Sequence, residues 1–333
     1  MTKQTHLPII DITPFLDGTN KYSVASQVAK ACKEIGFLII SGHGIDEKII
    51  ETAFRKSREF FDLPQVNKDR YHPNIGAQQR GYHAFASRGL AYTIGKDAPP
   101  DLRETYFLGP LADHRDYFKY STEALKAYAP NIFPKEPDGL DDALKAIYRS
   151  YEHLSENLLK IFAIGLEQNE NYFSGLIKKH FSILSSHNYP PLRQPPKKDQ
   201  LRTGAHTDFG AITILAMTEA AGGLEILMPN QKWLPVQPPN DCLVVNLGDM
   251  MARWTNDHWK STLHRVVNPK NLNDQTSRRQ TIGYFMHPDY DTLIEVLPSC
   301  IGARNSPKFK PISAGQHIAE KIRASHEGSL KDR

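Results

Sequence analysis

The sequence predicts a mainly β core with flanking α-helices, arranged as an antiparallel barrel or jelly roll. From about residue 181 onward, short runs of strand-forming residues alternate with turn signals, which is typical of a barrel or jelly roll rather than of strand–helix–strand units. Before that point, apolar residues recur at helical spacing in several segments. One β core wrapped by helices accounts for both patterns.

The first part of the chain is predicted to hold a short strand, a helix, a buried strand and a second helix. Apolar residues recur at helical spacing over residues 24–35, and Gly36 is suited to end that helix. Residues 37–40 are continuously apolar, as in a buried strand. The second helix is expected to begin after Asp46 and to end before Pro64, because aspartate caps helix N-termini and proline does not continue a helix.

The middle of the chain changes from loops to a long helix. Residues 65–136 are rich in Gly, Pro, His and Tyr and show weak periodicity, so we expect long loops with short elements. An amphipathic helix follows, with an apolar stripe that runs from Leu144 to Ile161. Residues 314–324 are expected to form a closing helix that acts as a lid.

The β-rich part of the chain contains a series of short predicted strands. They are residues 182–189, 211–217, 224–227, 242–247, 263–267 and 280–286. We expect residues 1–135 to form an N-terminal region that packs on the barrel, and residues 136–333 to form the barrel core with its C-terminal helix. Because no linker-like stretch separates these regions, both are expected to form one compact unit.

The composition is that of a globular protein, with 40% apolar and 23% charged residues. A net charge of +4 is too small and too dispersed to indicate a nucleic-acid partner. No apolar run approaches the roughly 18 residues that a membrane span requires. The 3 cysteines have no CxxC spacing, which argues against a disulfide framework or a structural zinc site. Since the start shows no signal-peptide pattern, a cytoplasmic location is expected.

Three residues that are far apart in the sequence form a candidate metal site. His206 and Asp208 are two residues apart, so in an extended segment both side chains point to one face, and His264 must reach them from another strand. Two imidazoles and one carboxylate are the ligands of non-haem Fe(II) oxygenases, which keep open positions on the metal. The alternative is a chance grouping of polar loop residues. Other histidines are expected to be surface or structural residues: His43, His72, His83, His258 and His287.

A candidate carboxylate site lies on one predicted strand. If residues 279–286 are extended, Arg279, Thr281 and Phe285 share one face. Arg279 and Thr281 then lie about 6.6 Å apart along that face, close enough for a guanidinium and a hydroxyl to hold one carboxylate. The alternative is that Arg279 is an exposed strand charge. The side chain of Arg278 points to the opposite face of the strand and is expected to be solvated.

Several segments together resemble the isopenicillin N synthase-like family of Fe(II)/2-oxoglutarate-dependent dioxygenases. These segments are residues 7–11, 36–44, 206–210 (His-Thr-Asp-Phe-Gly), 263–269 (Leu-His-Arg-Val-Val-Asn-Pro) and 279–285 (Arg-Gln-Thr-Ile-Gly-Tyr-Phe). The resemblance covers nearly the whole chain. It implies a distorted double-stranded β-helix, which is a cupin-like jelly roll, with the metal inside the barrel.

The resemblance also implies roles for the two candidate sites. His206, Asp208 and His264 match the iron ligands of the family. Arg279 and Thr281 match the Arg-x-Ser pair that holds the distal carboxylate of 2-oxoglutarate. Threonine replaces serine here, which keeps the hydroxyl and adds a methyl group.

Two further positions match the family pattern. Tyr189 matches a tyrosine that contacts the co-substrate, although His187 stands where that segment of the family usually has asparagine. Phe285 matches a position that often packs on the prime substrate, which is the molecule oxidised by the enzyme.

Residues 80–109 are similar to a stretch that lines the barrel mouth in this family. One interpretation is that a positive group there, for which Arg103 is the candidate, pairs with a carboxylate of the prime substrate. The favoured interpretation is a surface ion-pair network of Arg103 with Asp101 or Glu104, because exposed ion pairs are common.

The resemblance implies an enzyme that uses Fe(II), 2-oxoglutarate and O2 to hydroxylate, desaturate or cyclise a small organic substrate, with release of succinate and CO2. One alternative is a 2-oxoglutarate-independent oxidase of the isopenicillin N synthase type, in which the Arg-x-Ser pair holds the carboxylate of the substrate. Another is a non-catalytic metal-binding sensor that keeps the fold. The sequence leaves the substrate and the oligomeric state open.

Overall fold

The computed structural model describes residues 6–73, 79–96, 98–271, 275–302 and 305–330. The strands of its large sheet are β1 (Ile9–Asp11), β2 (Phe37–Ser41), β3 (Gly81–His83), β4 (Glu104–Leu108), β5 (Ile183–Tyr189), β7 (Ile212–Met217), β10 (Leu243–Leu247) and β12 (Arg279–Met286). The strands of its small sheet are β6 (Thr203–His206), β8 (Leu224–Leu227), β9 (Trp233–Pro235) and β11 (His264–Val266). A hairpin of β13 (Leu293–Ile294) and β14 (Ile312–Ser313) follows.

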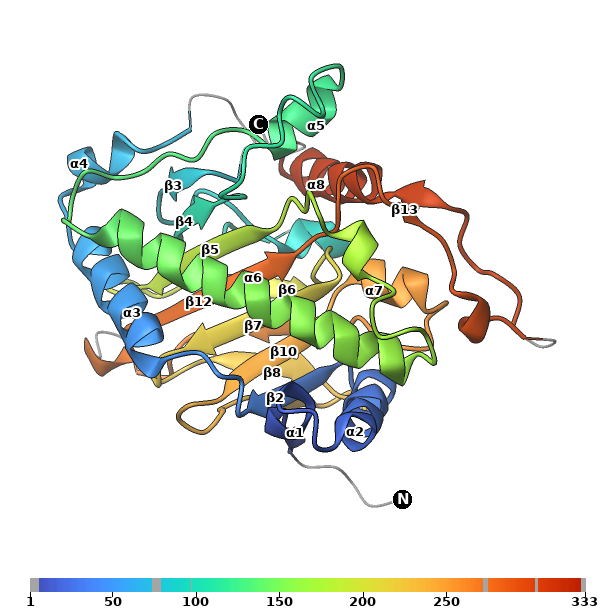
Figure 1. Cartoon of the computed structure of the whole chain (residues 1–333). Helices are drawn as coiled ribbons and strands as arrows, with labels where there is room; N and C mark the ends of the chain where they lie inside the picture. The colour runs from blue at the N-terminus through green and yellow to red at the C-terminus, as the bar shows by residue number, and fades with distance from the viewer. Residues whose placement is uncertain (1–5, 74–78, 97, 272–274, 303–304, 331–333) are drawn as a thin grey trace.

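The order of the strands within the sheets is that of a jelly roll. The large sheet runs β1-β2-β10-β7-β12-β5-β4-β3, and the small sheet runs β6-β11-β8-β9 (Figure 1). Neighbouring strands are mostly distant in sequence and antiparallel, while β1 and β2 pair in parallel. The predicted fold class, a mainly β core with flanking helices, is therefore confirmed.

Helices flank the two sheets. They are α1 (Thr13–Leu16), α2 (Lys21–Glu34), α3 (Glu47–Phe61), α4 (Gln65–Asp69), α5 (Thr122–Ala127), α6 (Leu140–Gly165), α7 (Asp249–Trp254) and α8 (Ala314–Leu330). The long helix α6 crosses one face of the large sheet in Figure 1, and α2 and α3 pack against both α6 and strands of this sheet. Tyr148 and Tyr151 of α6 lie edge-on to Tyr284 of β12. This packing fills the helical side of β12 with apolar side chains and leaves its other face for the barrel interior.

Local sequence signals explain where the N-terminal helices begin and end. The carboxylate of Asp46 accepts a hydrogen bond from the backbone N–H of Lys48, which caps α3 at the expected residue. Gly36 follows α2 with φ at +77°, and a Cβ there would lie 2.1 Å from the carbonyl oxygen of Lys260. Glycine is therefore required at the turn between α2 and β2.

Most predicted elements are confirmed, and one missed strand shows why others are harder to find. Each of the expected strands after residue 181 is present within one or two residues of its predicted ends. The elements without a clear sequence signal include β6, β9 and α7. β6 reads Thr-Gly-Ala-His, which has little intrinsic preference for a strand, and it is extended because it pairs with β11. Residues 65–136 contain the expected short elements, among them β3, β4 and the 3-10 helix η1 (Ala91–Ile94).

The N-terminal region shares its sheet with the barrel core. β1 to β4 come from residues 1–135, and they pair with β10 and β5 of the remaining chain. The division of the chain at residue 135 stays a prediction. None of the helices in the described part of the chain combines the length and the apolarity that a membrane crossing needs.

Candidate metal centre and active site

Three side chains converge between the two sheets as the sequence predicts. His206 is the last residue of β6, and it pairs in register with His264, the first residue of β11. Asp208 follows two residues after His206. One ligand atom of each residue lies within 4.8 Å of the other two, and all three residues are buried. The Nε2 atoms of both histidines are 3.6 Å from Oδ1 of Asp208.

Backbone carbonyls orient both imidazoles. Nδ1 of His206 lies 2.8 Å from the carbonyl oxygen of Gly204, and Nδ1 of His264 lies 3.1 Å from that of Thr262. Since a carbonyl only accepts hydrogen bonds, each Nδ1 carries a proton, and the neutral form of each ring then has its free lone pair on Nε2. Burial, with His264 acting in the same direction, lowers the pKa of His206. Its imidazole is therefore neutral at neutral pH, the form that binds a metal.

Two neighbouring side chains orient the carboxylate. Oδ2 of Asp208 accepts hydrogen bonds from the Thr213 hydroxyl at 2.5 Å and the Asn246 amide at 2.7 Å. Burial alone raises the pKa of Asp208, but the two imidazoles and these two hydrogen bonds outweigh burial and lower it. Oδ1 is left facing the histidines. Two imidazole nitrogens and one carboxylate oxygen, from side chains that are each held by an outer hydrogen bond, fit a divalent iron with open positions.

The predicted face of β12 lines a cavity beside these ligands. This inner cavity has a volume of about 50 Å³. Its wall includes the metal cluster, which consists of the three candidate ligands His206, Asp208 and His264, together with Arg279, Thr281 and Phe285. The parity predicted for β12 is therefore correct. Tyr189, which pairs in register with Arg279, lines the same cavity.

Arg279 is a buried cation without an acidic partner. The residue is only 2% exposed, and no carboxylate forms an ion pair with it in the described residues. Nη1 has no hydrogen-bond partner, Nη2 contacts Sδ of Met217 at 3.4 Å, and the guanidinium lies 5.2 Å from the ring centre of Tyr189. Burial of an unpaired charge is costly, so these donors are suited to an anionic ligand.

An outer cavity of about 100 Å³ adjoins the metal cluster. His206, Asp208 and Phe285 line both cavities, as do Arg103 and His187. Ile318 of α8 contributes to the wall of the outer cavity, and Nε2 of His317 lies 3.0 Å from the carbonyl oxygen of Phe209. The C-terminal helix thus forms one side of the outer cavity, and its role as a lid stays a prediction.

A larger cavity of about 560 Å³ lies beyond Arg279, with Glu47, Glu51 and Asp241 in its wall. None of the three residues of the metal cluster lines it. We therefore place the chemistry at the two smaller cavities.

Three sequence-based expectations need correction. Arg278 does point away from the cavity, but it is not solvated: its side chain is 15% exposed, pairs with Asp62 at 2.6 Å and bonds Asn188. Arg103 does pair with Asp101, but that pair is buried rather than on the surface. Glu104 pairs with Lys68 instead.

Of the five histidines expected to be surface or structural residues, one lies in the site. His287 is buried and lines the outer cavity, and burial lowers its pKa to about 3. His83 is also buried, whereas His72 and His258 are exposed. His43 is partly exposed.

Sequence reasoning missed the residues that support the ligands. Thr213 and Asn246 sit on β7 and β10 and face the inner cavity. Asn246 is the one polar residue in the apolar run of β10, and an isolated polar residue in a buried strand is the sequence feature that could have identified it.

Comparison with known proteins identifies the family to which the chain is similar. Residues 176–288 match the model of the 2OG-Fe(II) oxygenase superfamily, and residues 7–136 match that of the non-haem dioxygenase in morphine synthesis N-terminal region. A 2-oxoglutarate-Fe(II) type oxidoreductase of Emericella nidulans is 31% identical over 97% of this chain and 90% of its own length. A 2-oxoglutarate-dependent dioxygenase of Monascus ruber is 31% identical over 98% of this chain and 97% of its own.

A solved structure from Neurospora crassa has the same fold over nearly its whole length. This full-length protein, in complex with α-ketoglutarate, which is 2-oxoglutarate, superposes with a TM-score of 0.83 at 28% identity, covering 98% of each chain. Further structures of the same Neurospora protein hold thymine or 5-formyluracil in addition to α-ketoglutarate.

Proposed function

We propose that this chain, which belongs to the 2OG-Fe(II) oxygenase superfamily, binds its iron through His206, Asp208 and His264. The chain is a 2-oxoglutarate-dependent dioxygenase that uses Fe(II), 2-oxoglutarate and O2. The observation that carries the assignment of residues is the convergence of two oriented imidazoles and one oriented carboxylate in a buried cavity.

Arg279 and Thr281 are proposed to hold the distal carboxylate of 2-oxoglutarate, with Tyr189 beside it. The guanidinium offers unsatisfied donors in a fork that fits a carboxylate, and the threonine hydroxyl adds another donor. When bound, the iron with 2-oxoglutarate and O2 supplies the oxidation of a C–H bond, while 2-oxoglutarate becomes succinate and CO2. The chain itself binds and aims the two organic molecules and keeps water from the buried site.

The prime substrate is proposed to be a small organic molecule in the outer cavity. Phe285 lies in the walls of both cavities, so it can pack on a substrate next to the metal cluster, and Arg103 is the cation available there. The Neurospora protein binds thymine, which supports a substrate of about that size for this chain. Hydroxylation, desaturation and ring closure share these ligands and differ in the position of the substrate.

The two alternative functions are less well supported. The relatives at 31% identity are 2-oxoglutarate-Fe(II) or 2-oxoglutarate-dependent enzymes, which favours a dioxygenase over a 2-oxoglutarate-independent oxidase. A non-catalytic sensor has no need of the buried, unpaired Arg279. We also propose a reducing cytoplasmic location, since Cys32, Cys242 and Cys300 are unpaired and Fe(II) is maintained there.

The proposed function predicts a visible charge-transfer band. Anaerobic apoprotein mixed with Fe(II) and then with 2-oxoglutarate is expected to develop a saturable metal-to-ligand band, because the 2-oxo acid chelates the metal. Absorbance titration measures it, and the Asp208→Asn variant is the negative control. Iron binding without a band would favour the 2-oxoglutarate-independent oxidase, and no iron binding would favour the sensor.

The hydrogen bonds to Asp208 predict a measurable effect on iron affinity. The Thr213→Val, Asn246→Leu double variant is expected to bind Fe(II) about 10- to 100-fold more weakly, because both groups that orient the carboxylate are lost. Competition with a coloured chelator measures the affinity. Thr213→Ser, which keeps the hydroxyl, should remain near the wild type, and an unchanged affinity in the double variant would refute the orienting role.

A further inference from the structure

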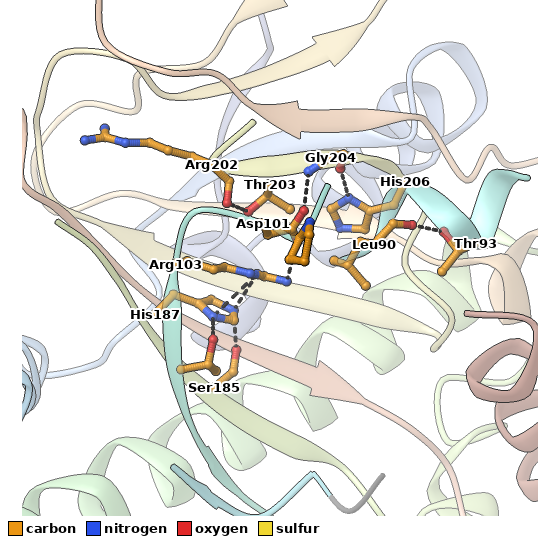
Figure 2. A network of polar contacts seen from close by, with 12 residues as sticks. Leu90, Thr93, Asp101, Arg103, Ser185, His187, Arg202, Thr203, Gly204 and His206 are labelled. Atoms are coloured by element: carbon orange, nitrogen blue, oxygen red, sulfur yellow. Dashed lines mark hydrogen bonds and ion pairs between the residues drawn. The ribbon is translucent and has the colours of Figure 1, made fainter. Parts of the chain in front are cut away.

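Arg103 lies in the wall that the inner and outer cavities share. Its side chain is 13% exposed, and Nη1 lies 3.4 Å from Nε2 and 3.5 Å from Nδ1 of His187 (Figure 2). The ring nitrogens of His187 already bond the hydroxyls of Ser185 at 2.9 Å and Thr105 at 2.8 Å. The contacts of 3.4 and 3.5 Å between Arg103 and His187 are long, so they leave the donors of Arg103 able to bind a ligand.

One buried carboxylate fixes the other side of this guanidinium. Oδ2 of Asp101 lies 3.2 Å from Nη2 of Arg103, and Oδ1 accepts a hydrogen bond from the backbone N–H of Gly204 at 2.9 Å. The carbonyl of Gly204 in turn contacts Nδ1 of His206, as Figure 2 shows. Asp101 thus joins Arg103 to the strand that carries a metal ligand, and Arg103 is held in place without a bound substrate.

A second guanidinium leaves this region with an excess of positive charge. Arg88 lies 5.9 Å from the ring centre of Phe107, which lines the outer cavity, and its carbonyl accepts the N–H of Asp101. Within the described chain, no ion pair neutralises Arg88. Burial and the charge of Arg103 lower its pKa to about 10, so it remains a cation at neutral pH.

The remaining groups of the outer cavity do not balance this charge. Burial lowers the pKa values of His187 and His287, so both imidazoles are neutral. Asp208 is the only carboxylate that lines the outer cavity in the described residues, and the proposed iron would neutralise its charge. Apolar side chains form most of the other wall: Leu90, Phe107, Ile183, Phe209, Phe285 and Ile318.

We propose that the prime substrate is a small carboxylate-bearing anion with an apolar body, and that Arg103 binds its carboxylate. This inference rests on the proposed function. The Asp101 pair uses one Nη of Arg103, and the planar group keeps other donors for a ligand on the cavity side. Arg88 and Arg103 carry two positive charges against the one negative charge of Asp101, so one positive charge is left for an anion to pair with, while the apolar body packs on Phe285.

The experiment compares acids with their uncharged amides. Anaerobic enzyme with Fe(II) and 2-oxoglutarate is titrated with benzoate and benzamide, phenylacetate and phenylacetamide, and hexanoate and hexanamide, and the shift of the charge-transfer band reports binding next to the metal. In at least one pair, the acid is expected to bind about 10-fold or more tightly than the amide. Equal binding in every pair, including no binding by either member, overturns the proposal.

Variants separate the two sites. Arg103→Gln is expected to remove the preference for the acid while the dissociation constant of 2-oxoglutarate stays within about twofold, and Arg103→Lys is expected to be intermediate. Because Arg103→Gln leaves Asp101 buried and unpaired, the Asp101→Asn, Arg103→Gln double variant is the second test. Arg55→Gln, at an exposed ion pair on α3, is the matched control.

Two results would overturn the assignment of Arg103. If the acid preference survives in both Arg103 variants, another group binds the carboxylate. If the variants weaken 2-oxoglutarate binding instead, Arg103 belongs to the co-substrate site. Failure of the proposed function is distinguishable, because the wild-type protein would then form no charge-transfer band at all.

Discussion

Alanine in place of His206, Asp208 or His264 is expected to reduce iron-dependent turnover to the level measured without iron. Each substitution removes one of the three donor atoms that converge within 4.8 Å. Loss of an outer hydrogen bond to a metal ligand costs about 10- to 100-fold in affinity, and loss of the ligand itself should cost more. Since the iron would perform the oxidation, a variant that does not bind iron has no other group that can oxidise the substrate.

The measurements are iron content, the charge-transfer band and succinate release. Asp208→Ala also leaves Thr213 and Asn246 without their acceptor, at a cost of about 1–3 kcal/mol for each buried group. Asp208→Asn preserves the shape and is the better test of the charge. His153→Ala, at a side chain that is 77% exposed, is the control. Full activity in any one ligand variant would remove that residue from the cluster.

The sequence predicted the barrel strands because their pattern is local. β8, for example, consists of residues 224–227 both in the prediction and in the structure. β6 carries no such pattern, since it becomes a strand only through its pairing with β11. His206 was nevertheless placed correctly beside Asp208, because the alternation of side chains in any extended segment puts both on one face.

The orientation of a site residue could be predicted where the alternation of side chains along one strand determines it. The burial of a site residue could not be predicted where it depends on contacts with residues far away in the sequence. The parity of β12 separated Arg279 from Arg278 without any knowledge of the fold. The burial of Arg103 depends instead on its partner Asp101. The carboxylate of Asp101 accepts a hydrogen bond from the backbone N–H of Gly204, a residue 103 positions after Asp101 in the chain. A loop arginine beside an aspartate looks the same in sequence whether the pair is exposed or enclosed.

Burial also explains the second error, which concerned Arg278. Opposite parity takes its side chain out of the cavity but not out of the protein. Its Nε donates to Asn188 at 3.0 Å, and Asn188 bonds the buried Glu104. Alternation therefore tells which face a side chain occupies, while the covering elements decide whether that face meets water.

Arg279→Leu is expected to weaken 2-oxoglutarate binding by about 10- to 150-fold, the range that corresponds to loss of a charged hydrogen bond worth roughly 1.5–3 kcal/mol. Iron binding without 2-oxoglutarate should be unchanged, because Arg279 does not contact the metal ligands. Thr281→Val should have a smaller effect of about 2- to 13-fold, which corresponds to the roughly 0.5–1.5 kcal/mol of a neutral hydrogen bond. The apparent KM and the titrated charge-transfer band measure both effects.

The matched control is the adjacent residue of the same type. Arg278→Lys changes a guanidinium that points away from the cavity, so 2-oxoglutarate binding should stay near the wild-type value. Arg279→Lys keeps the charge but loses the planar fork, and it should fall between the wild type and Arg279→Leu. Equal effects of the substitutions at positions 278 and 279 would contradict a specific carboxylate contact.

Thermal stability distinguishes a binding role of Arg279 from a structural one. In the ligand-free protein, Arg279 is a buried charge without an acidic partner, so leucine should leave the melting temperature unchanged or raise it. At about 100 times its dissociation constant, 2-oxoglutarate should stabilise the iron-loaded wild type by about 2.7 kcal/mol. At the same concentration, that stabilisation should fall to about 0.4 kcal/mol or less in Arg279→Leu if affinity falls about 100-fold or more. A lower melting temperature without ligand, together with retained stabilisation by 2-oxoglutarate, would instead make Arg279 a structural residue.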